Sequence, residues 1–312
     1  MSLQVQQLNK HYHTVTAVNN LSFEVNQGEI FALLGPNGAG KSSLVKMLVG
    51  FTHADSGCIK LIDGSQSYSQ IPAHLLGYLP EDRGLYPEKT LKQNLQFFAS
   101  LHGVSNNDFN KRCEYWLDKF SLSSRINDPL KSLSKGNQQK VQLISAILHE
   151  PKWVILDEPF SGLDPINQEL VVEFLAQLKQ QGMTVILSAH QMAMVEKLAD
   201  RVLLLNQGQS VLYGDLTNIL TTQQARVIKV QFAEPLDEFA VNELKDKYSV
   251  EQIKAQQLQI TLLEEQSLNT LLPSLLVLGD IVELKNQAQS LHSLYLNAVS
   301  EHNKKLKQGA QL

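Results

Sequence analysis

Four short runs of consecutive apolar residues stand out along the chain. They are IFALL at 30–34, WVIL at 153–156, TVIL at 184–187 and RVLLL at 201–205. A strand that is hydrophobic at every position is typical of a parallel sheet covered by helices on both faces. The intervals hold helical patterns such as QELVVEFLAQLKQQG, whose final Gly182 is suited to close a helix. The pattern therefore predicts an α/β layer architecture with a largely parallel sheet.

Two regions beside these runs have a different pattern. Residues 3–25 alternate in part between apolar and polar positions, as in LSFEV, with polar breaks around Asn19 and Asn26. We read antiparallel strands there, ahead of the first buried run. From about 91 to 150 the apolar spacing is helical, as in LKQNLQFFASLHG. We predict an inserted helical subdomain over 91–150, within a first domain of residues 1–220.

After Gly214 the pattern changes again. VIKVQF, QLQITLL and DIVELK read as strands, LDEFAVNELKDKY and QSLNTLLPSLLVLG read as helices, and residues 250–254 are a further strand candidate. A final helix starts at Ser290. The order approximates β-α-β-β-α-β, a small split α/β sandwich. We predict a C-terminal α+β accessory domain over 221–312.

Composition narrows the class of protein. Of 312 residues, 43% are hydrophobic and 19% are charged, and the formal net charge is −4, which argues against a disordered chain and against a dedicated nucleic-acid binder. The two cysteines, Cys58 and Cys113, lie far apart and indicate neither a disulfide framework nor a zinc site. The first residues do not read as a secretory signal, and no apolar run approaches the ~20 residues that span a bilayer. We expect a cytoplasmic protein.

The run IFALL leads directly into GPNGAGKSS, which matches G-x-x-x-x-G-K-[ST] and is followed by a helical pattern. The glycines let backbone N–H groups turn around phosphates at the start of that helix. In such a P-loop the lysine reaches the β- and γ-phosphates and the next hydroxyl binds Mg²⁺. We predict nucleotide binding by Gly35, Pro36, Asn37, Gly38, Ala39, Gly40, Lys41, Ser42 and Ser43, with Ser42 also a metal ligand.

Acidic side chains follow the second apolar run. Asp157 and Glu158 end KWVILDEP at the carboxyl edge of the predicted sheet, where open α/β sheets bind their ligands. We predict that Asp157 binds Mg²⁺ and that Glu158 accepts the proton of the attacking water. His190 follows the next run, in TVILSAH, and should face the same site. The alternatives are a solvated pair of carboxylates and a structural histidine.

Taken together, these motifs resemble those of the ATP-binding subunits of ABC transporters. The resemblance covers about residues 3–216. LSKGNQQK resembles the family's signature, and SGLD, which ends in Asp164, resembles its D-loop. The resemblance implies that Tyr12 stacks on adenine, that Asp164 belongs to the nucleotide site, and that His190 is the switch histidine.

The signature also implies a dimer. Ser134 and Gly136 lie just before a probable helix and offer a second anion-binding helix terminus. If the family geometry holds, this terminus is too far from the P-loop of its own chain. The resemblance therefore implies a head-to-tail homodimer or heterodimer, in which Ser134 and Gly136 complete the ATP site of the other subunit. The alternative is a simple helix cap.

Three positions depart from the commonest family pattern. Lys135 and Asn137 stand in the signature where glycine and glutamine are usual, which alters the close approach of the backbone. Glu81 follows GYLP, where the family usually has a glutamine that senses Mg²⁺. A carboxylate there can still bind metal through water, so we include Glu81 among the nucleotide and metal ligands. Tyr12 follows His11, and either ring can face adenine, although the spacing to the P-loop favours Tyr12.

The segment GYLPEDRGLYPEKTL, which contains Arg83, Leu85 and Tyr86, points to a subgroup. It resembles the ATP-binding subunits of ABC-2 type exporters related to sodium-extrusion and antibiotic-resistance pumps, and the accessory region resembles their C-terminal extension. We predict that Leu85, Tyr86, Phe97 and Phe98 receive a helix of the permease. For the two phenylalanines the alternative is the core of the helical subdomain.

These expectations combine into one function. We predict an ATPase subunit that dimerises around ATP and Mg²⁺ and drives a separate integral-membrane permease in export, on the inner face of the cell membrane and without a nucleic-acid partner. Lys41, Glu158 and His190 are the predicted catalytic residues. Two alternatives stay open: a soluble ABC ATPase in assembly or signalling, and a nucleotide-gated binding module that barely hydrolyses ATP.

Overall fold

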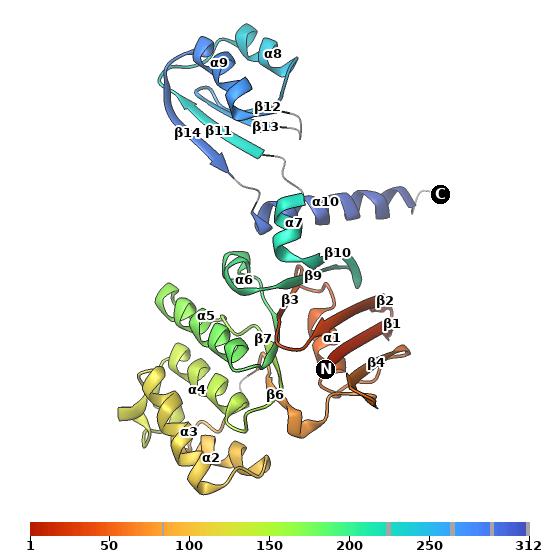
Figure 1. Cartoon of the computed structure of the whole chain (residues 1–312), viewed down its shortest axis with the longest axis vertical. Helices are drawn as coiled ribbons and strands as arrows, with labels where there is room; N and C mark the ends of the chain where they lie inside the picture. Colours follow the sequence, from red (N-terminus) through yellow and green to blue (C-terminus); the bar gives the residue numbers. More distant parts are fainter. Residues whose placement is uncertain (83, 223–225, 263–265, 288–289, 310–312) are drawn as a thin grey trace. The chain divides into compact units, whose positions relative to one another are not determined.

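The computed structural model describes the chain except for residues 83, 223–225, 263–265, 288–289 and 310–312. The chain forms two compact units. The large unit is Met1–Asp215 with Ala298–Leu312, and the small unit is Leu216–Asn297. Figure 1 labels most elements of both. Within the described residues, no helix is long and apolar enough to cross a membrane.

A six-stranded sheet forms the centre of the large unit. Its order is β10-β9-β3-β8-β7-β6, and every neighbouring pair is parallel except β10 with β9. The four predicted apolar runs are strands of this sheet, and β3, β7 and β8 are buried at every residue. The strands are Ile30–Leu34 (β3), Leu76–Leu79 (β6), Trp153–Asp157 (β7), Thr184–Ser188 (β8), Arg201–Asn206 (β9) and Gln209–Asp215 (β10). The predicted α/β fold class is confirmed.

An antiparallel sheet of order β2-β1-β4-β5 carries the N-terminal strands of the large unit. Helix α1 (Lys41–Leu48) packs into a hydrophobic core that both sheets share, and Phe23 of β2 stacks on Phe31 of β3 with ring centroids 5.4 Å apart. The two sheets are therefore joined by side-chain packing. The strands are Ser2–Tyr12 (β1), Val15–Asn26 (β2), Ser56–Asp63 (β4) and Gln66–Tyr68 (β5).

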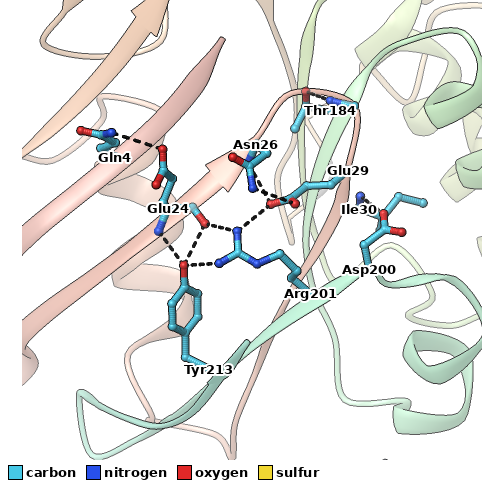
Figure 2. A network of polar contacts seen from close by, with 10 residues as sticks. Gln4, Glu24, Asn26, Glu29, Ile30, Thr184, Asp200, Arg201 and Tyr213 are labelled. Atoms are coloured by element: carbon cyan, nitrogen blue, oxygen red, sulfur yellow. Dashed lines mark hydrogen bonds and ion pairs between the residues drawn. The ribbon is translucent and has the colours of Figure 1, made fainter. Parts of the chain in front are cut away.

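A polar network also ties the two sheets together (Figure 2). Arg201, at the start of β9, donates from Nη1 to the carbonyl oxygen of Glu24 at 3.0 Å and lies 3.4 Å from Oε1 of Glu29. The Tyr213 hydroxyl of β10 accepts from the Glu24 N–H at 3.0 Å and contacts the Arg201 guanidinium. The Glu29 carboxylate accepts from the Asn26 N–H at 2.8 Å. The network fixes the end of β2 against β9 and β10.

Residues 91–150, all of which are described, contain three α helices and no strand. Thr90 and Gln93 form a capping box at the start of α2, while Ser105 and Ser134 cap α3 and α4. Figure 1 shows these helices side by side beyond β6 and β7. The helices of the large unit beyond α1 are Leu91–Leu101 (α2), Asn106–Lys119 (α3), Lys135–Ile147 (α4), Pro165–Gln180 (α5) and Met192–Leu198 (α6), with 3₁₀ turns at Ala73–Leu75, Ser123–Arg125 and Leu130–Ser132.

The small unit has the element order β11-α8-β12-β13-α9-β14, as the sequence pattern predicts. Its antiparallel sheet has the order β12-β13-β11-β14. Alternate residues of β11 and β13, such as Val230 and Ile260, are fully buried in one core with Leu271 of α9. The elements are Arg226–Phe232 (β11), Glu238–Lys245 (α8), Ser249–Lys254 (β12), Gln257–Leu262 (β13), Leu268–Leu278 (α9) and Ile281–Gln287 (β14).

The limits of the units differ from the predicted ones. The sequence prediction places the boundary between residues 220 and 221, a position inside α7 (Leu216–Thr222), whereas the small unit begins at Leu216. Leu216 is buried, and no glycine or proline interrupts the helix that it starts. The last helix, α10 (Leu291–Gly309), starts one residue after the predicted Ser290, but Ala298–Leu312 groups with the large unit. Helical periodicity predicts the helix but not the unit with which each part of it groups.

Candidate functional site

The carboxyl ends of β3, β7 and β8 meet at one edge of the central sheet and border a cleft of about 420 Å³, which we call the polar cleft. Residues from distant parts of the sequence converge there, as expected for the ligand site of an open α/β sheet. The lining consists of Tyr12, Val15, Ala17, residues 37–43, Glu81, Glu158 and His190. The structure thus brings together most of the residues predicted to bind nucleotide.

The P-loop depends on its glycines in two ways. Gly35 and Gly40 have φ values of 149° and 104°, and a Cβ on them would lie 2.4 Å and 2.1 Å from the carbonyl oxygens of Leu205 and Ala17. At these positions any side chain would collide with neighbouring strands. Gly38, with φ 79°, faces open space, so only its left-handed backbone favours glycine there. The loop is therefore held closely against β2 and β9.

Lys41 is the first residue of α1, and its ammonium is turned into the P-loop. Nζ donates to the carbonyl oxygens of Gly35 at 2.8 Å and Pro36 at 3.2 Å. Burial lowers the pKa of Lys41, while the charges of Glu158 and Asp157 oppose that change. A phosphate that entered the cleft would offer the ammonium a negative partner in place of two neutral carbonyls.

Ser188 organises the two carboxylates at the end of β7. Its hydroxyl donates to Oδ1 of Asp157 at 2.5 Å and accepts from the N–H of Glu158 at 3.0 Å. The contact follows from strand register, because Asp157 pairs with Ser188 between β7 and β8. The sequence analysis missed Ser188. Its signal was available in principle, since a hydroxyl that ends one buried strand stands level with the carboxylate that ends the next.

Glu158 has an uncommon backbone conformation for a residue with a side chain, with φ 55°. Oε1 lies 2.9 Å from Nε2 of His190, at the end of the neighbouring strand. Burial raises the pKa of Glu158 to about 7, although the charge of Lys41 opposes the rise. Burial and Lys41 lower the pKa of His190. This places a carboxyl group that can take up a proton near neutral pH beside an imidazole that favours its neutral form.

Oxygen donors suited to Mg²⁺ lie at the same edge of the sheet. Asp157 is buried at the end of β7, and Ser42 and Glu81 line the cleft. The part of the chain that the structure describes has no group of three or more His, Cys, Asp or Glu that could hold a metal unaided. Mg²⁺ usually binds through one or two carboxylates together with waters and substrate phosphates, so these donors fit an ion that arrives with a nucleotide. Their metal role stays a prediction.

The two aromatic candidates beside the cleft point to different partners. Tyr12 lines the cleft, with 39% of its surface exposed, and Nζ of Lys10 lies 5.3 Å from its ring centroid. His11 turns to Asp55 instead: its N–H donates to Oδ2 at 2.6 Å and its Nδ1 lies 3.3 Å from the same atom. The hydrogen bond from Lys10 lowers the pKa of Asp55 to about 2. The geometry therefore favours Tyr12 as the base-stacking residue.

Five of the predicted nucleotide ligands do not line the polar cleft. Two of them, Gly35 and Pro36, belong to the P-loop, where their carbonyl oxygens accept from Nζ of Lys41. The other three lie at the starts of helices. Ser134 caps α4 and accepts from the N–H of Asn137 at 3.3 Å, and Gly136 lies in the first turn of that helix. Asp164 caps α5 and accepts from the N–H of Asn167 at 2.9 Å. Within one chain these residues serve as helix caps or first-turn residues. Their role toward a nucleotide stays a prediction.

A second cleft of about 420 Å³ lies in the large unit, and we call it the apolar groove. It is formed by the segment after α1, by β6 with the segment that follows it, and by one face each of α2 and α4. Leu85 and Phe98 line the groove, and Leu85 is buried. Tyr86 and Phe97 are 50% and 41% exposed, with their rings edge to face at 5.5 Å. Arg83 lies outside the described residues.

Comparison with known proteins gives a consistent set of relatives. Residues 18–161 match the family described as ABC transporter. An uncharacterised ABC transporter ATP-binding protein of Methanocaldococcus jannaschii is 42% identical over 217 residues, which cover 70% of this chain and 79% of that protein. The linearmycin resistance ATP-binding protein LnrL of Bacillus subtilis is 28% identical over 312 residues, covering 95% and 97% of the two chains. A solved structure of an ATP-binding subunit of an ABC transporter has a TM-score of 0.65 at 32% identity, covering 72% of this chain and 93% of that one.

Proposed function

Because the chain belongs to the family of ABC transporter ATP-binding proteins, we propose that its polar cleft binds Mg-ATP and that two such subunits close around the nucleotide to drive a separate membrane permease in export. The chain is an ATP-binding subunit of an ABC transporter and hydrolyses ATP. The observation that carries the proposal is the meeting of Lys41, Glu158 and His190 in one cleft whose outer wall holds Tyr12.

In the proposed complex the phosphates lie in the P-loop at the N-terminus of α1. Backbone N–H groups and the helix dipole favour an anion at that position. Lys41 exchanges the carbonyl oxygens of Gly35 and Pro36 for oxygens of the β- and γ-phosphates. Ser42 and Asp157 would hold Mg²⁺, and Glu81 would add a further carboxylate near it. When bound, Mg²⁺ neutralises charge that develops on the phosphates.

Hydrolysis needs a proton acceptor beside the γ-phosphate, and Glu158 fits that role. A water oxygen forms a bond to the γ-phosphorus, the bond from that phosphorus to the β–γ bridging oxygen breaks, and the proton of the water passes to Glu158. The raised pKa of Glu158 favours this uptake near neutral pH. His190, 2.9 Å from the carboxylate, orients the water or the γ-phosphate.

The signature residues support a dimer. Ser134 and Gly136 stand at the N-terminus of α4, outside the polar cleft of their own chain. In the proposed dimer they approach the γ-phosphate bound to the other subunit, and Asp164 comes from the same side at the start of α5. Lys135 is exposed in the first turn of α4 and adds a positive charge near that phosphate. A second copy or a different ATP-binding subunit can fill the partner's place.

The apolar groove is the proposed dock for the permease. Leu85 and Phe98 offer apolar lining within it, and Tyr86 and Phe97 offer exposed rings. Docking through this groove would hold the subunit on the inner face of the membrane. The direction of transport is proposed from LnrL, a resistance protein to which the chain is similar over both of its units.

Affinity purification from detergent-solubilised membranes tests the proposal. The tagged wild-type chain should recover a multi-span membrane protein together with vanadate-sensitive ATP hydrolysis. The variant Tyr86→Asp, Phe97→Asp should lose that protein, because two charges would enter a desolvated contact. These exposed positions are preferable to Leu85, whose burial means that an aspartate would disturb the fold.

The matched control is Tyr115→Asp, which places the same charge on an exposed ring of α3 outside the groove. It should recover the membrane protein as the wild type does. If the wild type recovers soluble partners only, from a preparation in which other membrane complexes survive, the chain would instead be a soluble ABC ATPase. If the double variant keeps the membrane protein, the dock lies elsewhere.

A further inference from the structure

The lining of the apolar groove combines an uncharged, mainly apolar surface with a few polar side chains. The described lining contains no Asp, Glu, Lys or Arg, and most of it is aliphatic or aromatic. Besides Ser145, whose hydroxyl donates to a backbone carbonyl of its own helix, two polar side chains from the α4 segment, Gln142 and His149, interrupt this apolar surface. A groove that only received an apolar helix would need neither of them.

Gln142 is buried, with 3% of its surface exposed, and neither atom of its side-chain amide has a hydrogen-bond partner. The hydroxyl of Ser145 donates to the backbone carbonyl of Gln142 at 2.8 Å and leaves the side chain unused. A buried amide without partners lowers the stability of the folded chain, because it loses its hydrogen bonds to water and gains none in the protein. The fold of this chain alone therefore gives no reason for an amide at this position.

His149 also has a buried side-chain atom without a hydrogen-bond partner. Its Nε2 lies 3.0 Å from the carbonyl oxygen of Leu76, and because a carbonyl only accepts, Nε2 carries the hydrogen. Nδ1 is then a bare acceptor, and it is buried without a partner. The ring stacks on His102 with centroids 3.7 Å apart. Burial lowers the pKa of His149 to about 4, so the ring is neutral at pH 7.

The two residues together define a pattern. Gln142 lies in α4, and His149 follows the last residue of that helix, Ile147, by two residues. An amide is best satisfied by a group that accepts and donates at once, whereas Nδ1 needs a donor. A charged group would be desolvated here without a counter-charge among the described lining residues. A partner that fits both positions is therefore uncharged.

We propose that Gln142 and His149 determine which permease this subunit accepts: the segment that enters the groove carries an Asn or Gln side chain opposite Gln142 and an uncharged hydrogen-bond donor opposite His149. This inference rests on the proposed function, because it assumes that the groove is the permease dock. The three atoms without hydrogen-bond partners, two of Gln142 and one of His149, belong to residues that line the groove. The terminal torsion of a glutamine is soft, so a small turn of the amide brings it to an entering partner.

The test measures recovery of the membrane protein by tagged Gln142→Met and Gln142→Leu. Both remove the amide without adding charge, so the isolated chain should melt no lower than the wild type and keep its basal ATP hydrolysis. Affinity for the solubilised membrane protein should fall about tenfold or more, because the partner's amide is left unpaired. Gln180→Leu, on the exposed surface of α5, is the matched control and should bind as the wild type does.

The outcomes separate the two proposals. If Tyr86→Asp, Phe97→Asp abolishes recovery while both Gln142 variants bind like the wild type, the polar anchor is wrong and the dock stands. If the wild type recovers no membrane protein, both proposals fail.

Partner substitutions give an independent readout. One Asn or Gln of the recovered permease, changed to Leu, should weaken binding to the wild type and add no further loss with Gln142→Met. Additive losses for every such residue would overturn the inference.

Discussion

The polar cleft and the apolar groove have the same volume, about 420 Å³, and opposite chemistry. The lining of the polar cleft includes the charged side chains of Lys41, Glu81 and Glu158. The described lining of the groove has no Asp, Glu, Lys or Arg. The cleft lies where parallel strands of the central sheet end, whereas the groove is lined by β6, by the segments after α1 and β6, and by one face each of α2 and α4. The cleft offers charged partners to a charged ligand, whereas the groove would desolvate a charged group without giving it a counter-charge.

The difference shows that the two sites select what they bind by different interactions. In the polar cleft, burial moves the pKa of Lys41 down and that of Glu158 up, so its ionisable groups act through their charge. In the groove, selectivity rests on neutral hydrogen-bonding atoms that lack partners, at Gln142 and His149. In this chain, ionisable groups with shifted pKa values point to the site of the reaction. Buried neutral atoms without hydrogen-bond partners point to the proposed contact with the permease.

The largest expected effect is on the chemistry of the polar cleft. Glu158→Gln keeps the size of the side chain and removes the proton acceptor, so steady-state phosphate release should slow by about a hundredfold or more. Equilibrium ATP binding should remain near that of the wild type. Glu169→Gln, an exposed change on α5, should leave the rate unaltered. A Glu158→Gln enzyme with the wild-type rate would leave the cleft without its proposed base.

The next effect tests the neutrality of the groove. Because the folded pKa of His149 is about 4 and its ordinary value is 6.5, the unfolded chain binds more protons between these pH values. The free energy of unfolding therefore falls as the pH falls through that window, by at most about 3 kcal/mol from this group. The variant His149→Leu should lose less stability than the wild type when the pH is lowered. The measurement is the drop in thermal midpoint between pH 7 and pH 4.5.

The control for that measurement is His53→Gln, a change at an exposed histidine, which should keep the wild-type loss. The carboxylates of the chain titrate alike in all three proteins, so the difference between them reports His149. Equal losses in the wild type and in His149→Leu would show that the groove tolerates a charged ring, which would weaken the contrast with the polar cleft.

The smallest effect concerns the rim of the polar cleft. Tyr12→Ala should weaken ATP binding about tenfold, since stacking of an aromatic side chain on a base contributes about 1–3 kcal/mol. Binding of inorganic triphosphate should not change, because it lacks a base. His11→Ala, whose ring turns to Asp55, should bind ATP as the wild type does. A loss confined to His11→Ala would reverse the choice between the two rings.

Much of the fold could be predicted because parallel strands buried on both faces leave continuous apolar runs, as in β3, β7, β8 and β9. The short strand β6 escaped the sequence analysis because Gly77 interrupts its apolar run. A Cβ on Gly77 would lie 2.1 Å from the carbonyl oxygen of Ala146, so the glycine lets α4 pack directly against the strand. The requirement for close packing against α4 therefore removes an apolar side chain from the strand pattern.

The motifs of the polar cleft could be predicted from the sequence because phosphate chemistry requires particular residue types at fixed spacing. The roles of Ser188 and Gln142 could not be predicted. A serine at the end of a strand and a glutamine in a helix are ordinary residues, and their meaning depends on the register of β7 with β8 and on the face that α4 turns to the groove. Such roles come from pairing across the fold, which periodicity along one segment does not record.

The network around Arg201 has a mechanical consequence (Figure 2). The antiparallel sheet carries Tyr12 and one wall of the polar cleft, while the central sheet carries the P-loop and Glu158. Arg201, the Tyr213 hydroxyl and the stacked rings of Phe23 and Phe31 couple these sheets stiffly. Arg201 is the first residue of β9, and β3 and β8 begin beside it, so the network lies at the edge of the central sheet opposite the polar cleft. The two sheets are therefore tied together at the end that does not meet the nucleotide, and the proposed transport cycle can move the cleft edge without breaking these contacts.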